Sequence, residues 1–233
     1  HPGALRAAFR PPVDLNAGRA FAAGLITCDD DIEAAVDAFY AATGRVNRWT
    51  ALQVLRLARR LPLVALPPLR EAHLRGRVHS RERDRAAIGF HYDQPIAFYR
   101  SFLDRGLTYS CAYYDDGVET LDDAQEAKID HLLRKMRLRE GERLLDIGCG
   151  WGSLVLRAAR RFGASALGVT LSRSQYDEAR RRIAELGLQG RVRVELWDYR
   201  EIREPAFDKI GSVGMFEHVG RAQLPAYFGK AYE

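Results

Sequence analysis

Residues 144–152 read Leu-Leu-Asp-Ile-Gly-Cys-Gly-Trp-Gly, so an apolar segment runs directly into three alternating glycines. This pattern predicts a strand followed by a tight turn, because glycine adopts backbone angles that are closed to other residues. The helix expected after the turn points its free N–H groups at a polar ligand. The stretch predicts a cradle for a nucleotide-like cofactor, with a ligand-free turn as the alternative.

The spacing of these glycines separates two classes of cofactor. Gly148, Gly150 and Gly152 give G-x-G-x-G, whereas dinucleotide-binding folds carry G-x-G-x-x-G. Thr170 stands where an acidic residue would bind the ribose of NAD. Both departures favour S-adenosylmethionine over NAD.

Strands and helices are predicted to alternate on either side of this turn. We expect strands over residues 143–147, 164–169, 192–197 and 209–214, and helices over 122–136, 153–162 and 172–186. This order is typical of the α/β class, here a Rossmann-like methyltransferase with a doubly wound parallel sheet. Such a sheet normally has further strands. We therefore expect its C-terminal strands to be missing from this chain, so that the domain is C-terminally incomplete.

The N-terminal part carries all of the excess positive charge. The net charge is +5, and residues 1–90 hold 14 arginines against 9 acidic residues. The segment 76–90 is too polar to bury, which is typical of a linker. We expect a basic, mainly helical domain over residues 1–85 and a methyltransferase domain over residues 86–233, with the boundary near Ala86.

Two helices are expected within this basic part. Asp29 to Asp31 place negative charge at the start of a helix that ends near Ala42. A second helix, over residues 50–61, carries Leu52 and Leu55 on one side and several arginines elsewhere. A basic amphipathic helix of this kind docks on an anionic membrane or packs against its own domain. The sequence leaves both arrangements open.

Several classes of protein are excluded by composition. Cys28, Cys111 and Cys149 are widely spaced, which argues against a disulfide framework or a metal site and fits a reducing cytoplasm. The longest apolar run, residues 61–69, is interrupted by prolines and is too short to span a bilayer. No zinc or helix-turn-helix pattern accompanies the basic charge, so we expect no nucleic-acid partner. We expect a cytoplasmic protein that is peripheral at the inner face of the membrane.

The ends of the second and third predicted strands carry polar side chains. Ser172 and Gln175 have the spacing of a capping box, in which each side chain bonds a free backbone N–H group. Gln175 alternatively turns toward a ribose or an adenine. Trp197 and Asp198 suit stacking on adenine and hydrogen bonding to its amine.

Two further segments are candidates for chemistry. Cys111 lies among aromatic residues in 109–114, and its thiol is a small apolar filler, a nucleophile, or part of a loop over the cofactor. We favour the loop, because electron-rich rings attract a sulfonium cation. Glu217 and His218 follow the fourth strand and are expected to be partly desolvated catalytic groups facing the cleft, with a solvated surface pair as the alternative.

Taken together, several segments resemble the cyclopropane-fatty-acyl-phospholipid synthases and the related mycolic acid cyclopropane synthases. These segments are residues 91–93, 109–113, 145–152, 168–172 with Gln175, 198–200 and 213–220. The resemblance implies transfer of a methyl or methylene group from S-adenosylmethionine to the cis double bond of an unsaturated phospholipid acyl chain. The product is then a cyclopropane or a methylene- or methyl-branched chain. The alternatives are a soluble small-molecule methyltransferase and a non-catalytic, membrane-associated partner subunit.

The resemblance also implies roles for individual residues. Cys111, through its backbone, and Glu217 would hold bicarbonate, with other bicarbonate contacts beyond Glu233. The acyl chains and an anionic membrane surface are the expected partners, and a homodimer is one possible assembly. Residues implied to hold the cofactor are Tyr109, Ser110, Asp146, Gly148, Cys149, Gly150, Trp151, Gly152, Thr170, Leu171, Ser172, Gln175, Trp197 and Asp198.

Overall fold

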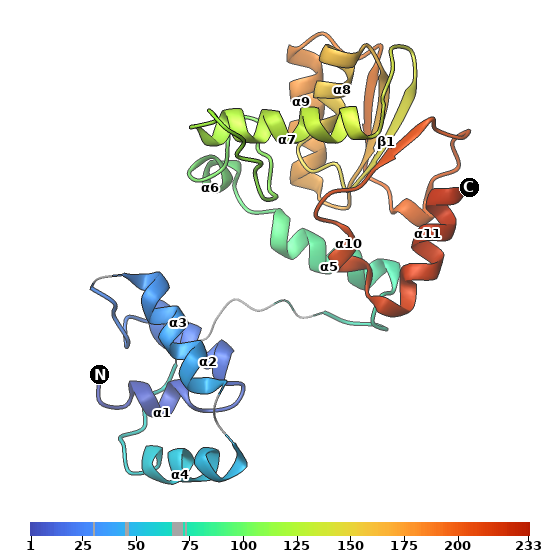
Figure 1. Cartoon of the computed structure of the whole chain (residues 1–233). Helices are drawn as coiled ribbons and strands as arrows, with labels where there is room; N and C mark the ends of the chain where they lie inside the picture. Colours follow the sequence, from blue (N-terminus) through green and yellow to red (C-terminus); the bar gives the residue numbers. More distant parts are fainter. Residues whose placement is uncertain (30, 45–46, 67–71, 73) are drawn as a thin grey trace. The chain divides into compact units, whose positions relative to one another are not determined.

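The chain forms two compact units, His1–Glu71 and Ala72–Glu233. The computed structural model describes residues 1–29, 31–44, 47–66, 72 and 74–233, and each unit is considered by itself (Figure 1). Asp30 of the predicted helix start and residues 67–69 of the apolar run lie outside the described residues.

The first unit is helical throughout its described elements. Its helices are α1 (Ala4–Ala8), α2 (Val13–Ala22), α3 (Ile32–Thr43) and α4 (Arg48–Ala58). Helix α3 begins after Asp31, whose carboxylate accepts hydrogen bonds from the N–H groups of Glu33 and Ala34. This cap confirms the helix start that acidic charge predicted.

The second unit is built on a parallel sheet of four strands in the order β3-β2-β1-β4. The strands are β1 (Arg143–Ile147), β2 (Ser165–Val169), β3 (Val192–Glu195) and β4 (Lys209–Gly211). Leu145 of β1 pairs in register with Leu167 on one side and Ile210 on the other. The predicted parallel sheet is thus confirmed, although β3 and β4 end earlier than expected.

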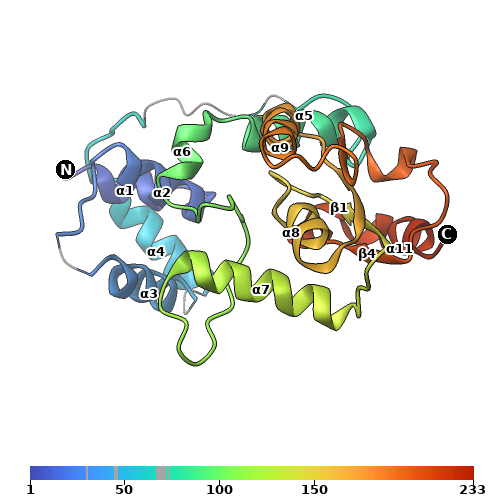
Figure 2. The ribbon, with the colours of Figure 1, turned by 90° about the horizontal axis from the view of Figure 1, so that it is seen from above.

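Helices cover both faces of this sheet (Figures 1 and 2). Side chains alternate along β1, so Leu144 packs with α8 and α7 while Leu145 packs on the opposite face with Tyr227. The doubly wound arrangement is therefore confirmed. One face carries α7 (Leu121–Lys135), α8 (Ser153–Phe162) and α9 (Arg173–Glu185). The helical segments that follow β3 in the chain are η1 (Tyr199–Glu201), α10 (Phe216–Val219), η2 (Arg221–Gln223) and α11 (Leu224–Tyr232).

The segment expected to be a linker folds as a helix. Helix α5 (Arg81–Tyr92) begins after Ser80, whose hydroxyl accepts from the N–H of Arg83, and α6 (Ile96–Arg100) follows. The division between units consequently lies upstream of Ala86, and α5 belongs to the second unit. The physical reason is that Asp84 of α5 forms an ion pair with Arg200 of this unit.

Candidate functional site

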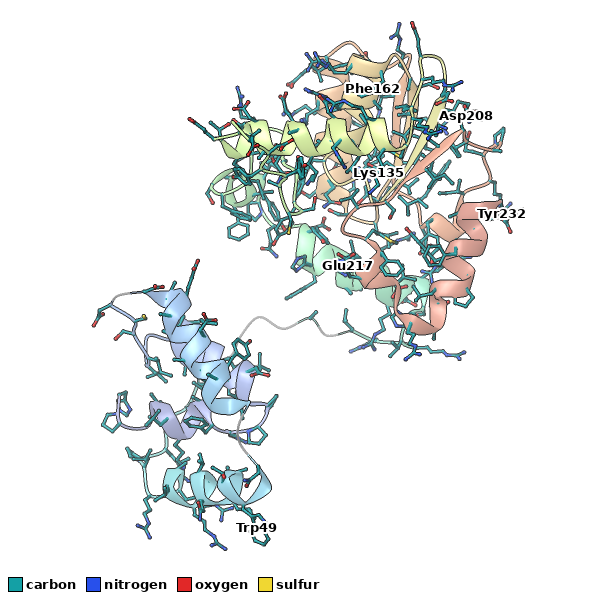
Figure 3. The ribbon with its side chains drawn as sticks, viewed as in Figure 1. Trp49, Lys135, Phe162, Asp208, Glu217 and Tyr232 are labelled. Atoms are coloured by element: carbon teal, nitrogen blue, oxygen red, sulfur yellow. The ribbon has the colours of Figure 1, made fainter. Side chains whose placement is uncertain are left out.

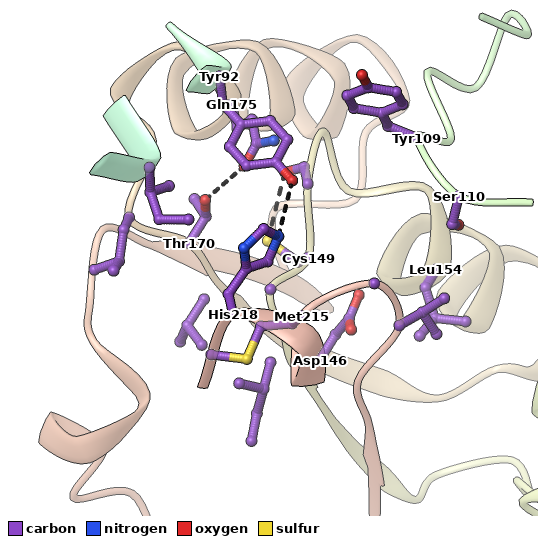
Figure 4. A pocket seen from close by; sticks show the side chains of 18 of the residues that line it. Tyr92, Tyr109, Ser110, Asp146, Cys149, Leu154, Thr170, Gln175, Met215 and His218 are labelled. Carbon is purple, nitrogen blue, oxygen red and sulfur yellow. Dashed lines mark hydrogen bonds between the residues drawn. The ribbon is translucent and has the colours of Figure 1, made fainter. Parts of the chain in front are cut away.

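A cavity of about 230 Å³ opens at the carboxyl ends of the strands, where ligands bind in parallel sheets of this type (Figure 4). It is lined from all four strand ends, from α5, from α7 and from the loop before α7. Of the residues predicted to hold a cofactor, the cavity brings together Tyr109, Ser110, Asp146, Gly148, Cys149, Gly150, Trp151, Thr170, Leu171, Gln175, Trp197 and Asp198.

The glycine turn between β1 and α8 provides room for a ligand. Gly148, Gly150 and Gly152 all have positive φ angles, of 84°, 54° and 90°. A Cβ atom on Gly150 would meet no atom within 4 Å, whereas one on Gly148 would lie 2.8 Å from the Cβ of Met215. Gly152 does not line the cavity and instead turns the chain into α8. Gly150 is therefore the glycine that leaves space on the cavity side.

At the end of β2, one amide is left free to bind a ligand. The hydroxyl of Thr170 donates to Oε1 of Gln175 at 2.7 Å. Within the described part of the chain, the amide nitrogen of Gln175 has no hydrogen-bond acceptor, and Gln175 lines the cavity. This N–H₂ group suits a ligand hydroxyl or carboxylate oxygen.

Ser172 is a structural residue in this geometry. Its hydroxyl accepts from the N–H of Gln175 at 3.1 Å and donates to Oδ1 of Asp93 at 2.6 Å. The side chain is fully buried and does not line the cavity. Only half of the predicted capping box forms, because the side chain of Gln175 is held by Thr170 and cannot reach back to the backbone of Ser172.

At the end of β3, Asp198 is bound by a guanidinium group. Nε of Arg200 donates to its Oδ1 at 2.7 Å, and Nη2 of Arg200 also reaches Oδ2 of Asp84 on α5 at 2.9 Å. Asp198 is almost fully buried. It therefore anchors Arg200, and through it α5, in addition to lining the cavity beside the half-buried Trp197.

Asp146 contributes a buried carboxyl group. Burial raises the pKa of Asp146 to about 7, and within the described residues its side chain makes no salt bridge. Burial also raises the pKa of the neighbouring Cys149 thiol well above its ordinary value, so that thiol is protonated and unreactive at neutral pH.

Helix α7 adds two residues that were not predicted from the sequence. Nζ of Lys128 donates to the hydroxyl of Ser110 at 2.7 Å and to its carbonyl oxygen at 3.3 Å. The amide nitrogen of Gln125 donates to the carbonyl oxygens of Ser110 and Thr108, at 2.8 and 3.2 Å. Lys128 lines the cavity. The sequence feature that could have indicated these two residues is their i, i+3 spacing, which places the side chains of Gln125 and Lys128 on one face of the helix.

The two residues after β4 differ in their placement. His218 lines the cavity, and its Nε2 lies 3.5 Å from the hydroxyl of Tyr92 on α5. Glu217 does not line it and is exposed near the edge of the unit (Figure 3). The expected desolvation of both groups is wrong, because the single turn of α10 buries Val219 and leaves Glu217 and His218 exposed.

The segment around Cys111 also departs from expectation. Cys111 is exposed and does not line the cavity. Tyr113 stacks on His131 with ring centroids 5.2 Å apart, and Phe216 packs against Phe228. Of the tyrosines in the segment 109–114, Tyr109 lines the cavity, and the other tyrosine and tryptophan rings that line it are Tyr92, Trp151, Trp197 and Tyr199.

Comparison with known proteins identifies relatives of the second unit. Residues 79–233 match the family model described as mycolic acid cyclopropane synthetase. A probable fatty acid methyltransferase from Pseudomonas putida is 47% identical over 157 residues, which make up 67% of this chain and 40% of that protein. Cyclopropane mycolic acid synthase 1 from Mycobacterium tuberculosis is 40% identical over 63% of this chain and 51% of its own length. The chain thus spans about half, or less, of these relatives.

A solved structure resembles the second unit in the same way. The crystal structure of mycolic acid cyclopropane synthase CmaA1 complexed with SAH and CTAB superimposes with a TM-score of 0.61 at 40% identity. The superposition covers 64% of this chain and 52% of that one.

Proposed function

The chain belongs to the mycolic acid cyclopropane synthetase family, and we propose on this basis that the protein modifies unsaturated fatty acyl chains. In the proposed reaction a one-carbon group is transferred from S-adenosylmethionine to a cis double bond of a phospholipid acyl chain. The sulfonium of the cofactor supplies the electrophilic methyl group. The product is a cyclopropane or a methylene- or methyl-branched chain.

One observation carries this proposal. Twelve residues expected to hold the cofactor line a single cavity at the carboxyl ends of the strands. The cavity fits S-adenosylmethionine, because the backbone at Gly150 leaves space and Gln175 offers an amide nitrogen without a partner in the described chain. Both features are available to a ligand with ribose hydroxyls and a polar amino-acid end.

The residues around the cavity suit an apolar acceptor. The rings of Tyr92, Tyr109 and Trp151 contribute aromatic surface that excludes water and stabilises positive charge on an alkene carbon under attack. A product that closes a ring must also lose a proton. Nε2 of His218 is the atom proposed to accept it, since His218 lines the cavity beside the Tyr92 hydroxyl.

Bicarbonate does not fit the described residues. Cys111 and Glu217, the residues implied to hold it, both lie outside the cavity lining, and both are exposed. Exposed residues outside the cavity lining do not shield an anion from water or aim it at a reacting carbon. No part of the proposed mechanism depends on this ion.

The first unit is proposed to bring the protein to its lipid substrate. Helix α4 exposes Trp49, Leu52 and Leu57 together with Arg56, and Arg59, which follows its last residue, is exposed as well. A helix that exposes both apolar and basic side chains is more favourably placed on an anionic membrane surface than in water. None of the described helices combines the length and apolar character that a bilayer crossing requires.

The enzymatic proposal is tested on the purified full-length protein with S-adenosylmethionine and phospholipid vesicles that contain cis-unsaturated chains. Mass spectrometry should find acyl chains heavier by one CH₂ group. Unchanged lipid together with methylation of a small soluble acceptor would support a soluble methyltransferase instead. Absence of both turnover and calorimetric binding of S-adenosylhomocysteine would support a non-catalytic partner subunit.

Membrane docking is tested separately by vesicle flotation. We expect the protein to float with vesicles of anionic phospholipid and not with vesicles of neutral phospholipid. Replacing Arg56 by glutamate should reduce flotation, whereas the same replacement at the exposed Arg10 is the control for charge alone. Equal loss with both variants would show that α4 is not the docking helix.

A further inference from the structure

We propose that Lys128 binds the carboxylate of the methionine end of S-adenosylmethionine. This inference rests on the proposed function and deepens it, because it gives the cavity a residue that distinguishes the complete cofactor from adenosine-like fragments. The resemblance described above implies no role for this lysine.

The position of Lys128 fits this end of the cofactor. Thr170 and Gln175 lie on one side of the cavity, and Ser110 and Asp146 lie on the other (Figure 4). Polar groups that suit a ribose and an adenine are found at the ends of β2 and β3, so the amino-acid end extends toward β1 and α7. Lys128 lines the cavity there, with its ammonium group on Ser110.

The charges in the cavity lead to the same assignment. Arg200 also lines the cavity, but its guanidinium is engaged by Asp198 and Asp84. Lys128 makes no salt bridge within the described part of the chain, and its two hydrogen bonds leave one of three ammonium protons for a ligand. A half-buried ammonium without a carboxylate is costly, and a ligand carboxylate relieves that cost.

The pKa of Lys128 reflects the same environment. Burial lowers the pKa of Lys128 from its ordinary value, and the neighbouring Asp104 and Cys111 oppose this shift. The carboxylate of Asp104 is already occupied by the N–H groups of Gly106 and Thr108. An additional anion at the ammonium would therefore be favourable.

Asp146 completes the complementarity to an amino acid. Its buried carboxyl group lines the same side of the cavity and has no cationic partner in the described chain. A free amino acid carries both an ammonium and a carboxylate. A carboxyl group and an ammonium group facing one cavity match these two charges, which a ligand without the amino-acid end lacks.

Gln125 offers a matched control within the same helix. It holds the same loop as Lys128, through the carbonyl oxygens of Ser110 and Thr108, but it carries no charge. A change at Gln125 therefore loosens the loop without removing the ammonium group.

The experiment measures calorimetric binding of two ligands, S-adenosylhomocysteine and 5′-methylthioadenosine, which lacks the amino-acid carboxylate and ammonium. Lys128→Met should weaken S-adenosylhomocysteine about tenfold or more, the loss expected for one charge-assisted hydrogen bond. The affinity for 5′-methylthioadenosine should change by less than about twofold. Lys128→Arg should restore most of the loss, and Gln125→Leu should weaken both ligands by the same factor.

Two results would overturn the inference. Equal weakening of both ligands by Lys128→Met would show that the lysine only supports the loop. Unchanged binding of both ligands would show that it has no role in recognition. Failure of the unaltered protein to bind either ligand would instead count against the proposed function, so the two failures are distinguishable.

Discussion

The two ends of the cavity are built in different ways. At the β2 end, Thr170, Ser172 and Gln175 are buried and connected by hydrogen bonds of 2.7 to 3.2 Å. At the β4 end, Glu217 and His218 are exposed, and the side-chain contact of His218 is a 3.5 Å approach to Tyr92. The proposed cofactor end is therefore preorganised, whereas the proposed reacting end has few contacts that fix it.

This difference indicates where binding and turnover are decided. Groups held by several buried hydrogen bonds lose little further freedom when a ligand binds. Exposed groups on a single helical turn need additional contacts before they have a fixed orientation. Changes at the β1 to β3 ends should therefore alter stability and cofactor affinity, and changes at the β4 end should spare both.

The largest effect is expected where α5 is tied to the β3 end. Arg200→Met leaves the buried carboxylate of Asp198 without its guanidinium partner, so we expect the free energy of unfolding to fall by about 3 to 5 kcal/mol. Arg81→Met removes the exposed ion pair with Glu201 and should cost about 1 kcal/mol or less. Urea titration followed by circular dichroism measures both, and equal losses would contradict the comparison.

The next largest effect is expected at the glycine turn. Gly150→Val fills the open space beside the turn and forces a β-branched residue to adopt a φ of 54°. We expect the affinity for S-adenosylhomocysteine to fall about a hundredfold or more in calorimetry. Gly190→Val, where φ is not positive and a Cβ also meets no neighbour, should leave that affinity unchanged. Retained binding in the Gly150 variant would mean that the ligand does not approach this turn.

A pH effect is expected from Asp146. Its pKa is raised to about 7 by burial, against 3.8 for the ordinary group, so the folded state keeps a proton that the unfolded state releases. The contribution of Asp146 to stability is therefore largest below pH 4 and declines as the pH rises through 7. We compare the free energy of unfolding of Asp146→Asn with that of the parent. The difference in favour of the variant should be larger at pH 8 than at pH 4, by about 1 kcal/mol or more. A stability difference independent of pH would contradict the raised pKa.

The smallest effects are expected from a pair of variants that compares the two ends directly. Thr170→Val removes the hydroxyl that orients Gln175, and we expect the affinity for S-adenosylhomocysteine to fall about fivefold. Glu217→Gln should change it by less than about twofold, because this residue lies outside the cavity lining. The reverse order of affinities would place the cofactor at the β4 end.

Most of the proposed cofactor end of the cavity was predictable from the sequence, because its residues are adjacent in the chain. The apolar run, the glycines and the cap residue Ser172 each act within a few residues, so their pattern predicts strand, turn and helix directly. Asp198 was predicted to face the cavity. Arg200, which binds Asp198, also pairs with Asp84, which lies more than a hundred residues away in the chain. No local pattern contains that information.

Helix α5 and the lysine of α7 show the same limit. The arginines and acids of residues 80–86 are typical of a linker, and they become a helix because Asp84 pairs with Arg200 of η1 and Asp93 binds the start of α9. Lys128 is one polar residue in a polar helix, and only the position of the loop at Ser110 reveals what it faces. Glu217 was misplaced because one turn of helix decides which side chains turn inward.

The placement of the three tryptophans has a practical consequence for spectroscopy. Trp49 is 66% exposed on α4 of the first unit, whereas Trp151 and Trp197 both line the cavity of the second. Intrinsic emission therefore has two separate sources, one on the helix proposed to dock on lipid and one at the cavity proposed to bind the cofactor. Replacing Trp49 by phenylalanine would isolate the second signal, so that ligand titrations can be followed without any added dye.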